Sequence, residues 1–250
     1  MSKELGSKIG RDLIDLAQLL RKTKLCKDTS SIDAAGNTCM SKATPDKWSY
    51  QLKPIVFEIP EPEIKRMPED AVDLTASLTV FVEGQPTEDK KIKNPLTNLL
   101  FNIEIQASRL NEKTETVDQL YAAWHLDKHI VNRLEEEPTY SHPLYHFAFG
   151  GHRMKAKGTD YYGGAIILDS PRFIYPPMDA VLGIDFILQN YFPKERISRL
   201  VADPEYIRIR RYSQNMLWKP FYTSLFSHWQ PDVCAVEDSF APHKLFPLYC

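Results

Sequence analysis

The chain has 250 residues, of which 43% are hydrophobic and 26% charged. Such a length and composition allow a sizeable core and exclude a disordered or fibrous protein. The 31 basic and 33 acidic side chains leave a net charge of −2, so no overall field favours nucleic acid or an anionic membrane, although a local basic patch could still bind nucleic acid. No window approaches the roughly 18 uncharged apolar residues of a spanning helix. We therefore expect a cytoplasmic protein that does not contact a membrane.

The cysteines stand at positions 26, 39, 234 and 250, without the C-x-x-C spacing of a structural zinc site. The histidines show no ligand spacing either, so we expect no metal and no cofactor. His142 and His146 would form a zinc pair only on a helix. On a strand, residues four apart lie about 13 Å from one another, too far to bind one ion.

Apolar residues recur at intervals of three and four between positions 4 and 24, which predicts an N-terminal amphipathic helix within residues 1–25. Residues 26–46 are rich in Ser, Thr, Asp and Gly and show no period. We expect a loop there.

From Trp48 onward the period changes to two, as is typical of strands with one buried face. The predicted strands are 48–59, 71–83, 97–108, 120–127, 143–150 and 165–168. Pro54 denies the first strand one ladder hydrogen bond, which favours an edge strand or a bulge. Most connections are too short for a crossover helix, so residues 47–170 should form one antiparallel sheet domain.

Beyond residue 170 the pattern is helical. One helix should begin after Pro176-Pro177 and stop at Pro193, and a longer one should run over 204–228 with Pro220 kinking or dividing it. We expect the final tail to pack as an extended arm. The fold class is then α+β: a central antiparallel β-meander, an N-terminal helix, and a C-terminal helical segment (171–250) packed on the sheet.

A candidate catalytic site arises from strand alternation, which sends His125 and Asp127 to the same face. If this strand pairs with 143–150, His146 shares that face, and His152 follows in the next turn. Several histidines on one face could act as acid, base or phosphate contact. The alternative is that each histidine is a satisfied structural residue. Asp169 could orient a histidine, but we favour a simple ion pair with Arg172.

Two basic stretches are candidates for an interface or for nucleic acid. Arg153 and Lys155 follow the Gly150-Gly151 pair, and the alternative for them is a solvated hairpin tip. On the last long helix, arginines alternate with aromatic residues, a mixture enriched at interfaces. The candidates there are Arg208, Arg211, Tyr212 and Trp218. The alternatives are a solvated helix face for the arginines and packing on the sheet for the aromatics.

Residues 117–170, with the strings WHLD, HPLYHFAFGG and ILDSPR, resemble small bacterial proteins of toxin-antitoxin and phage-defence operons, including the TumE-type toxins. The resemblance implies a bacterial cytosolic protein with an operon-encoded protein partner, and it transfers no catalytic residues. We expect a non-catalytic interaction subunit of a bacterial multiprotein system, concerned with phage or mobile-element defence. The alternative is a metal-independent, histidine-based ribonuclease or toxin.

Overall fold

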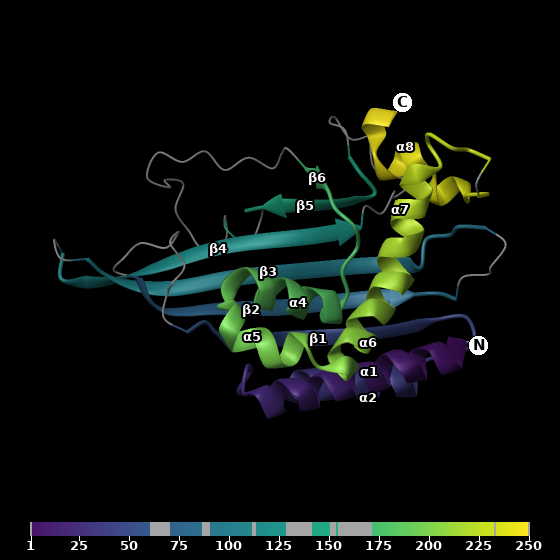
Figure 1. Cartoon of the computed structure of the whole chain (residues 1–250). Helices are drawn as coiled ribbons and strands as arrows, with labels where there is room; N and C mark the ends of the chain where they lie inside the picture. Colours follow the sequence, from purple (N-terminus) through teal and green to yellow (C-terminus); the bar gives the residue numbers. More distant parts are fainter. Residues whose placement is uncertain are drawn as a thin grey trace.

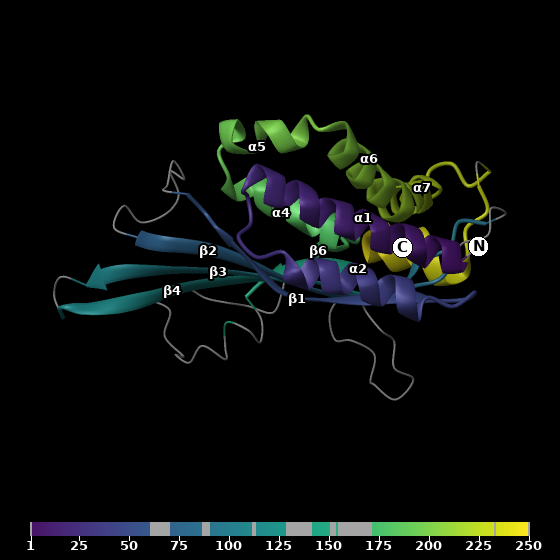
Figure 2. The same ribbon diagram turned by 90° about the horizontal axis from the view of Figure 1, so that it is seen from below.

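A computed structural model of the chain describes residues 2–60, 71–86, 91–111, 114–128, 142–150, 154, 172–232 and 234–249. Within these ranges, six strands form one antiparallel sheet that carries helices on one face (Figures 1 and 2). The sheet is flanked in sequence by N-terminal and C-terminal helices. The predicted α+β class is therefore confirmed.

The strands follow one another across the sheet in chain order, so the predicted meander is confirmed. They are β1 Trp48–Glu58, β2 Ala71–Gly84, β3 Leu96–Asn111, β4 Thr116–Lys128, β5 Tyr145–Phe149 and β6 Phe173–Ile174. Strand β6 lies past residue 170, where the sheet was expected to end. The strand predicted at 165–168 lies outside the described residues.

Strand β1 occupies the edge of the sheet. Its pairing with β2 shifts register between Leu52 and Ile55, on either side of Pro54. Because proline has no backbone N–H to donate, an edge position with an irregularity is where a strand tolerates it. This confirms the edge strand and the bulge expected from the sequence.

Alternation along the strands divides the sheet into two faces. Leu78, Phe101 and Leu126 are fully buried members of the hydrophobic core beneath the helices. The residues between them point to the opposite face, where Asn102 pairs in register with His125. The candidate histidine site therefore lies on the face turned away from the helices.

Helix α1 (Ser2–Thr23) confirms the predicted N-terminal helix. The prediction of a loop at 26–46 is wrong, because helix α2 (Ser30–Lys42) lies there. The buried positions of α2 are Ile32, Ala35, Gly36 and Cys39. A Cβ added at Gly36 would lie 2.6 Å from the carbonyl oxygen of Gly10 on α1. The two helices thus pack backbone to backbone, which small side chains permit and a search for large apolar residues misses.

Helix α4 (Ala180–Tyr191) begins three residues after Pro177 and ends before Pro193, as predicted. Asp179 caps it by accepting a hydrogen bond from the backbone N–H of Leu182. The amide of Ala180 donates to the hydroxyl of Tyr50 on β1, which ties the start of the helix to the sheet. Helix α5 (Lys194–Val201) follows at once.

The last long helix is divided, as Pro220 predicted, into α6 (Pro204–Ser213), a π-helical stretch η1 (Gln214–Trp218) and α7 (Lys219–Phe226). Proline lacks an N–H and clashes with the carbonyl four residues earlier, and the wider π turn immediately before it accommodates the defect.

The prediction that the tail is an extended arm is wrong. The tail forms the short helices η2 (Asp238–Phe240), α8 (Pro242–Leu245) and η3 (Pro247–Tyr249). The amide of Leu144, just before β5, donates to the carbonyl of Lys244. The tail therefore docks at the end of the sheet where β5 begins (Figure 1).

Of the helices in the described ranges, none is long and apolar enough to cross a membrane.

Candidate functional site

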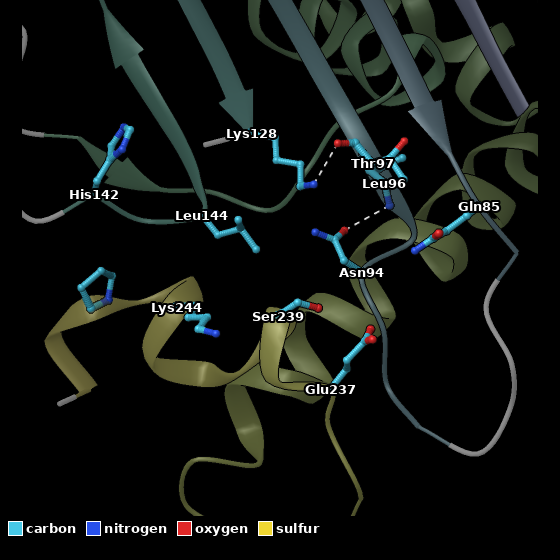
Figure 3. Close-up of a pocket in the computed structure, with 11 residues that line it drawn as sticks. Gln85, Asn94, Leu96, Thr97, Lys128, His142, Leu144, Glu237, Ser239 and Lys244 are labelled. Carbon is cyan, nitrogen blue, oxygen red and sulfur yellow. Dashed lines mark hydrogen bonds between the residues drawn. The ribbon is translucent and has the colours of Figure 1, made fainter. Parts of the chain in front are cut away.

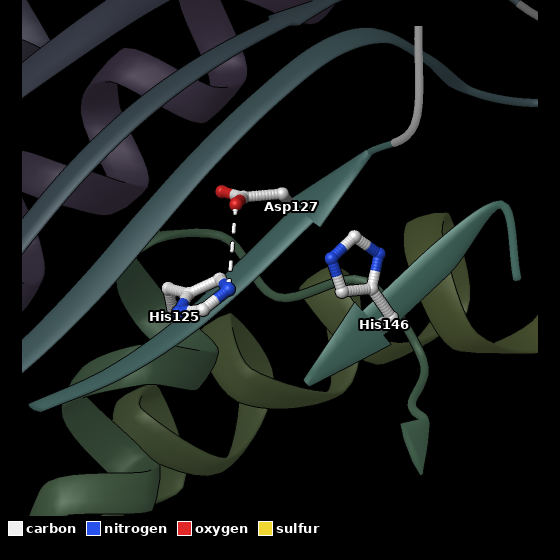
Figure 4. A group of neighbouring side chains, drawn as sticks. All are labelled: His125, Asp127 and His146. Atoms are coloured by element: carbon white, nitrogen blue, oxygen red, sulfur yellow. Dashed lines mark ion pairs between the residues drawn. The ribbon is translucent and has the colours of Figure 1, made fainter. Parts of the chain in front are cut away.

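The candidate site is built where β4 and β5 pair. Asp127 lies opposite His146 in the register, and His125 lies opposite Ala148. Because residues two apart on a strand share a face, His125, Asp127 and His146 all reach the face opposite the helices (Figure 4). The pairing and the shared face predicted for His125 and His146 are confirmed.

A third histidine joins them. The ring of His142 lies 4.6 Å from that of His146, and the ring of His146 lies 6.0 Å from that of His125, measured between centroids. The separation of about 13 Å expected for His142 and His146 on one strand is therefore wrong, because β5 begins only at Tyr145. We call His125, Asp127, His142 and His146 the histidine cluster.

Asp127 is placed to hold His125 in position. Nε2 of His125 lies 3.8 Å from the Asp127 carboxylate, so the two form an ion pair when the imidazole is protonated. Both side chains are partly exposed, 24% for His125 and 33% for Asp127. His125 is thus the member of the pair that can transfer a proton to a molecule bound on this face.

His146 is 5% exposed. Burial, the neighbouring His142 ring and the charge of Arg172 lower the pKa of His146 to about 3. The ring is therefore neutral near pH 7. Its Nδ1 is buried and makes no hydrogen bond within the described part of the chain.

Arg172 is a member of the site that the sequence did not assign to it. Strand β6 pairs Ile174 with His146, which carries Arg172 close enough to depress the pKa of that histidine. The sequence had suggested only an ion pair with Asp169, which lies outside the described residues. A guanidinium near His146 gives this face a group that binds phosphate or carboxylate well.

The site also contains a set of possible metal ligands. One donor atom each from His125, Asp127 and His146 lie within 4.8 Å of one another. A search for ligand spacing within one helix or loop could not find this set, because it comes from two paired strands. That the protein binds no metal stays a prediction.

A pocket of about 510 Å³ adjoins the cluster at the end of the sheet (Figure 3). His142 lies at its rim, Lys128 comes from the end of β4, and Lys244 comes from α8. The ammonium of Lys128 donates to the carbonyl of Thr97 across 2.9 Å, and burial lowers the pKa of this lysine. The volume lies within the range of about 300–1,000 Å³ found for small-molecule sites.

The arginines proposed for an interface differ in their surroundings. Arg208 donates to Asp12 and to Glu205, at 2.7 Å in each case, so much of its charge is neutralised within the fold. Arg211 is exposed. His152, Arg153 and Lys155 lie outside the described residues.

The two aromatic candidates make contacts within the chain. The ammonium of Lys8 lies 3.5 Å from the ring centre of Tyr212, and Nε1 of Trp218 donates to the carbonyl of Pro177 across 3.0 Å. The aromatic residues that do face solvent lie further along: Tyr222, Phe226 and Trp229 are 53%, 45% and 63% exposed. They line an open hollow of about 550 Å³.

No protein-family model, curated protein or solved structure matches the chain significantly. The geometry of the site therefore carries the functional argument.

Proposed function

We propose that the protein is a metal-independent ribonuclease whose active site is the histidine cluster. The observation that carries the proposal is the register pairing of Asp127 with His146, which sets two imidazoles and a carboxylate side by side on one sheet face. Proton transfer at such a site requires groups held within reach of one another, and this pairing supplies them.

The chemistry assigned to the cluster is internal transesterification of RNA. The neutral imidazole of His125, which is partly exposed and oriented by Asp127, accepts the proton of the ribose 2′-hydroxyl, and the 2′-oxygen attacks the adjacent phosphorus. The bond from phosphorus to the 5′-oxygen breaks, and the imidazolium formed at His125, stabilised by Asp127, gives that oxygen its proton. The products are a 2′,3′-cyclic phosphate and a 5′-hydroxyl, so atoms and charges balance.

Arg172 stabilises the negative charge that develops on the phosphate. Negative charge accumulates on the phosphate oxygens as the 2′-oxygen attacks, and a guanidinium donates paired hydrogen bonds to such oxygens. Arg172 lies immediately before β6, whose Ile174 pairs with His146, and its positive charge helps to lower the pKa of that histidine.

The experiment uses the purified full chain, a labelled random-sequence RNA pool and the variant His125→Ala. His125 is chosen because it is partly exposed, so its loss should leave the fold intact. The variant should cleave about 10²–10⁴-fold more slowly, the usual contribution of a general acid or base. His243→Ala, at an exposed histidine on α8, is the matched control. The proposal fails if the wild-type chain does not cleave the pool or if His125→Ala cleaves it equally fast.

A second candidate function is the non-catalytic subunit of a bacterial defence system that binds an operon-encoded protein. The observation that favours it is the exposure of Tyr222, Phe226 and Trp229 around one hollow, since exposed aromatic residues often carry the energy of an interface. Phe226→Ser combined with Trp229→Ser should abolish copurification of a protein encoded beside this chain and leave the melting temperature unchanged. Retention of that protein by the double variant would exclude this surface.

A further inference from the structure

We infer that the pocket beside His142 binds the phosphate and base of a ribonucleotide. The inference rests on the proposed function, because it assigns to the pocket a nucleotide next to the one that is cleaved. His142 connects the pocket with the histidine cluster, because it lines the pocket and its ring lies 4.6 Å from that of His146.

The pocket contains a donor whose orientation is fixed. Asn94 is only 7% exposed, and its Oδ1 accepts hydrogen bonds from the hydroxyl of Tyr145 at 2.6 Å and from the backbone N–H of Leu96 at 3.1 Å. With the oxygen held in this way, the amide nitrogen faces the pocket (Figure 3). An N–H donor prepared in advance on a pocket wall suits an anionic oxygen.

Two cations also line the pocket, Lys128 on the side of Asn94 and Lys244 across from it on α8 (Figure 3). The ammonium of Lys128 donates to the carbonyl of Thr97, and an ammonium has three N–H donors, so it can also donate to a ligand. Lys244 pairs with Asp238, which is 87% exposed. Ion pairs this exposed contribute little to stability, so a phosphate can take the place of Asp238. Together with Asn94, the lysines supply the pocket with N–H donors for an anion.

The side of the pocket away from His142 suits a nucleotide base. Gln85 and Glu237 lie on the side away from His142 (Figure 3). The carboxylate of Glu237 can accept from an exocyclic amino group, as Glu does from cytosine N4. Leu144 supplies apolar surface on the side nearer to His142 (Figure 3). A free inorganic anion would contact only Asn94 and the two lysines, whereas a nucleotide would also contact Gln85 and Glu237.

The experiment measures binding of cytidine 3′-monophosphate to the full-length chain by titration calorimetry, with inorganic phosphate and with cytidine as separate ligands. We expect one nucleotide per chain, with weaker binding of phosphate and of cytidine. Equal affinity for phosphate and for the nucleotide would reduce the site to a simple anion site and overturn the inference.

Asn94→Asp is the sharpest variant, because an aspartate keeps the oxygen that Tyr145 and Leu96 use and replaces the donor by a negative charge. It should weaken nucleotide binding at least about tenfold, since one hydrogen bond to a charged group is lost and a repulsion is added. Lys244→Met should also weaken it. Lys219→Met, at an exposed lysine of α7, should not. Melting temperatures show whether each variant is folded.

The inference fails if the nucleotide does not saturate the wild-type chain, or if folded Asn94→Asp and Lys244→Met bind it as tightly as wild type. Failure of the proposed function gives a different result: the nucleotide binds and Asn94→Asp weakens it, yet the wild-type chain does not cleave RNA. If RNA is cleaved and Asn94→Asp leaves KM unchanged, the pocket assignment alone is wrong.

Discussion

Asp179 and Ser213 are joined by a hydrogen bond of 2.8 Å from the serine hydroxyl to the carboxylate, and both residues are buried. The contact ties the start of α4 to the end of α6. The other carboxylate oxygen accepts from Leu182. Asp179 therefore holds the helical layer together at one point.

Replacing Asp179 tests this arrangement through its pH dependence. Burial raises the pKa of Asp179 above its ordinary value, so the folded state favours the protonated form. The stability that the protonated Asp179 carboxyl contributes is therefore fully present below about pH 3.9, its pKa in the unfolded chain. This contribution is lost as the pH rises through the higher pKa that the carboxyl has in the folded protein. Asp179→Asn should gain stability relative to wild type on going from about pH 4 to about pH 7.

Asp179→Ala supplies the companion measurement. This variant loses the helix cap and the partner of Ser213, at a cost of about 1–3 kcal/mol in the free energy of unfolding. Denaturant unfolding at several pH values measures both variants. Equal pH dependence of wild type and Asp179→Asn would contradict the raised pKa.

Gly183 of α4 packs closely against the sheet. A Cβ at this position would lie 2.5 Å from Cε2 and 2.9 Å from Cζ of Phe101, and Phe101 is fully buried. Overpacking of about 1–3 kcal/mol outweighs the helix propensity that alanine adds, about 1 kcal/mol. Gly183→Ala should therefore lower the melting temperature. Gln189→Ala, on the exposed side of the same helix, should not, and equal melting of the two variants would refute the close packing.

Arg208 should matter for stability more than Arg211. Its partner Asp12 is 5% exposed, so Arg208→Met leaves a carboxylate largely removed from water without its cation. Because the arginine itself is 41% exposed, we expect a moderate loss of about 1–2 kcal/mol. Arg211→Met should change the free energy of unfolding by less than about 0.5 kcal/mol. Similar losses in the two variants would show that the Asp12 contact contributes nothing.

We predict that the chain purifies without stoichiometric zinc and that chelator leaves RNA cleavage unchanged. The possible ligands are up to 4.8 Å apart, whereas donors around a tetrahedral zinc with bonds of about 2.0–2.1 Å lie roughly 3.3 Å from one another. The nearby charge of Arg172 also opposes a cation. Elemental analysis of protein prepared without chelator decides the matter: about one zinc per chain, lost in Asp127→Asn, would contradict the prediction.

Alternation was sufficient to predict much of the fold, because β2 and β3 each bury one face and so have a period of two in their apolar residues. Helix α2 could not be found in this way. Its contact with α1 depends on Gly10 and Gly36, which contribute close approach and almost no hydrophobic signal.

The candidate site was predictable in part for the same reason. The faces of His125 and His146 follow from alternation once β4 and β5 are taken as partners. The pocket does not follow, because it depends on the docking of the tail through Lys244 to Leu144, a contact across 100 positions of the sequence. Arg172 likewise reaches the site only through the pairing of β6.

The measurement that tests the central claim most directly compares kcat/KM for RNA cleavage by His125→Ala, His146→Ala and the variant carrying both changes. Groups that act as a unit in one active site are far from additive. We therefore expect His125→Ala to lose about 10²–10⁴-fold, His146→Ala to lose activity as well because its ring packs beside that of His125, and the double variant to lose little more than the slower single one. Losses that multiply in the double variant, or full activity in either single one, would contradict a shared active site at β4 and β5.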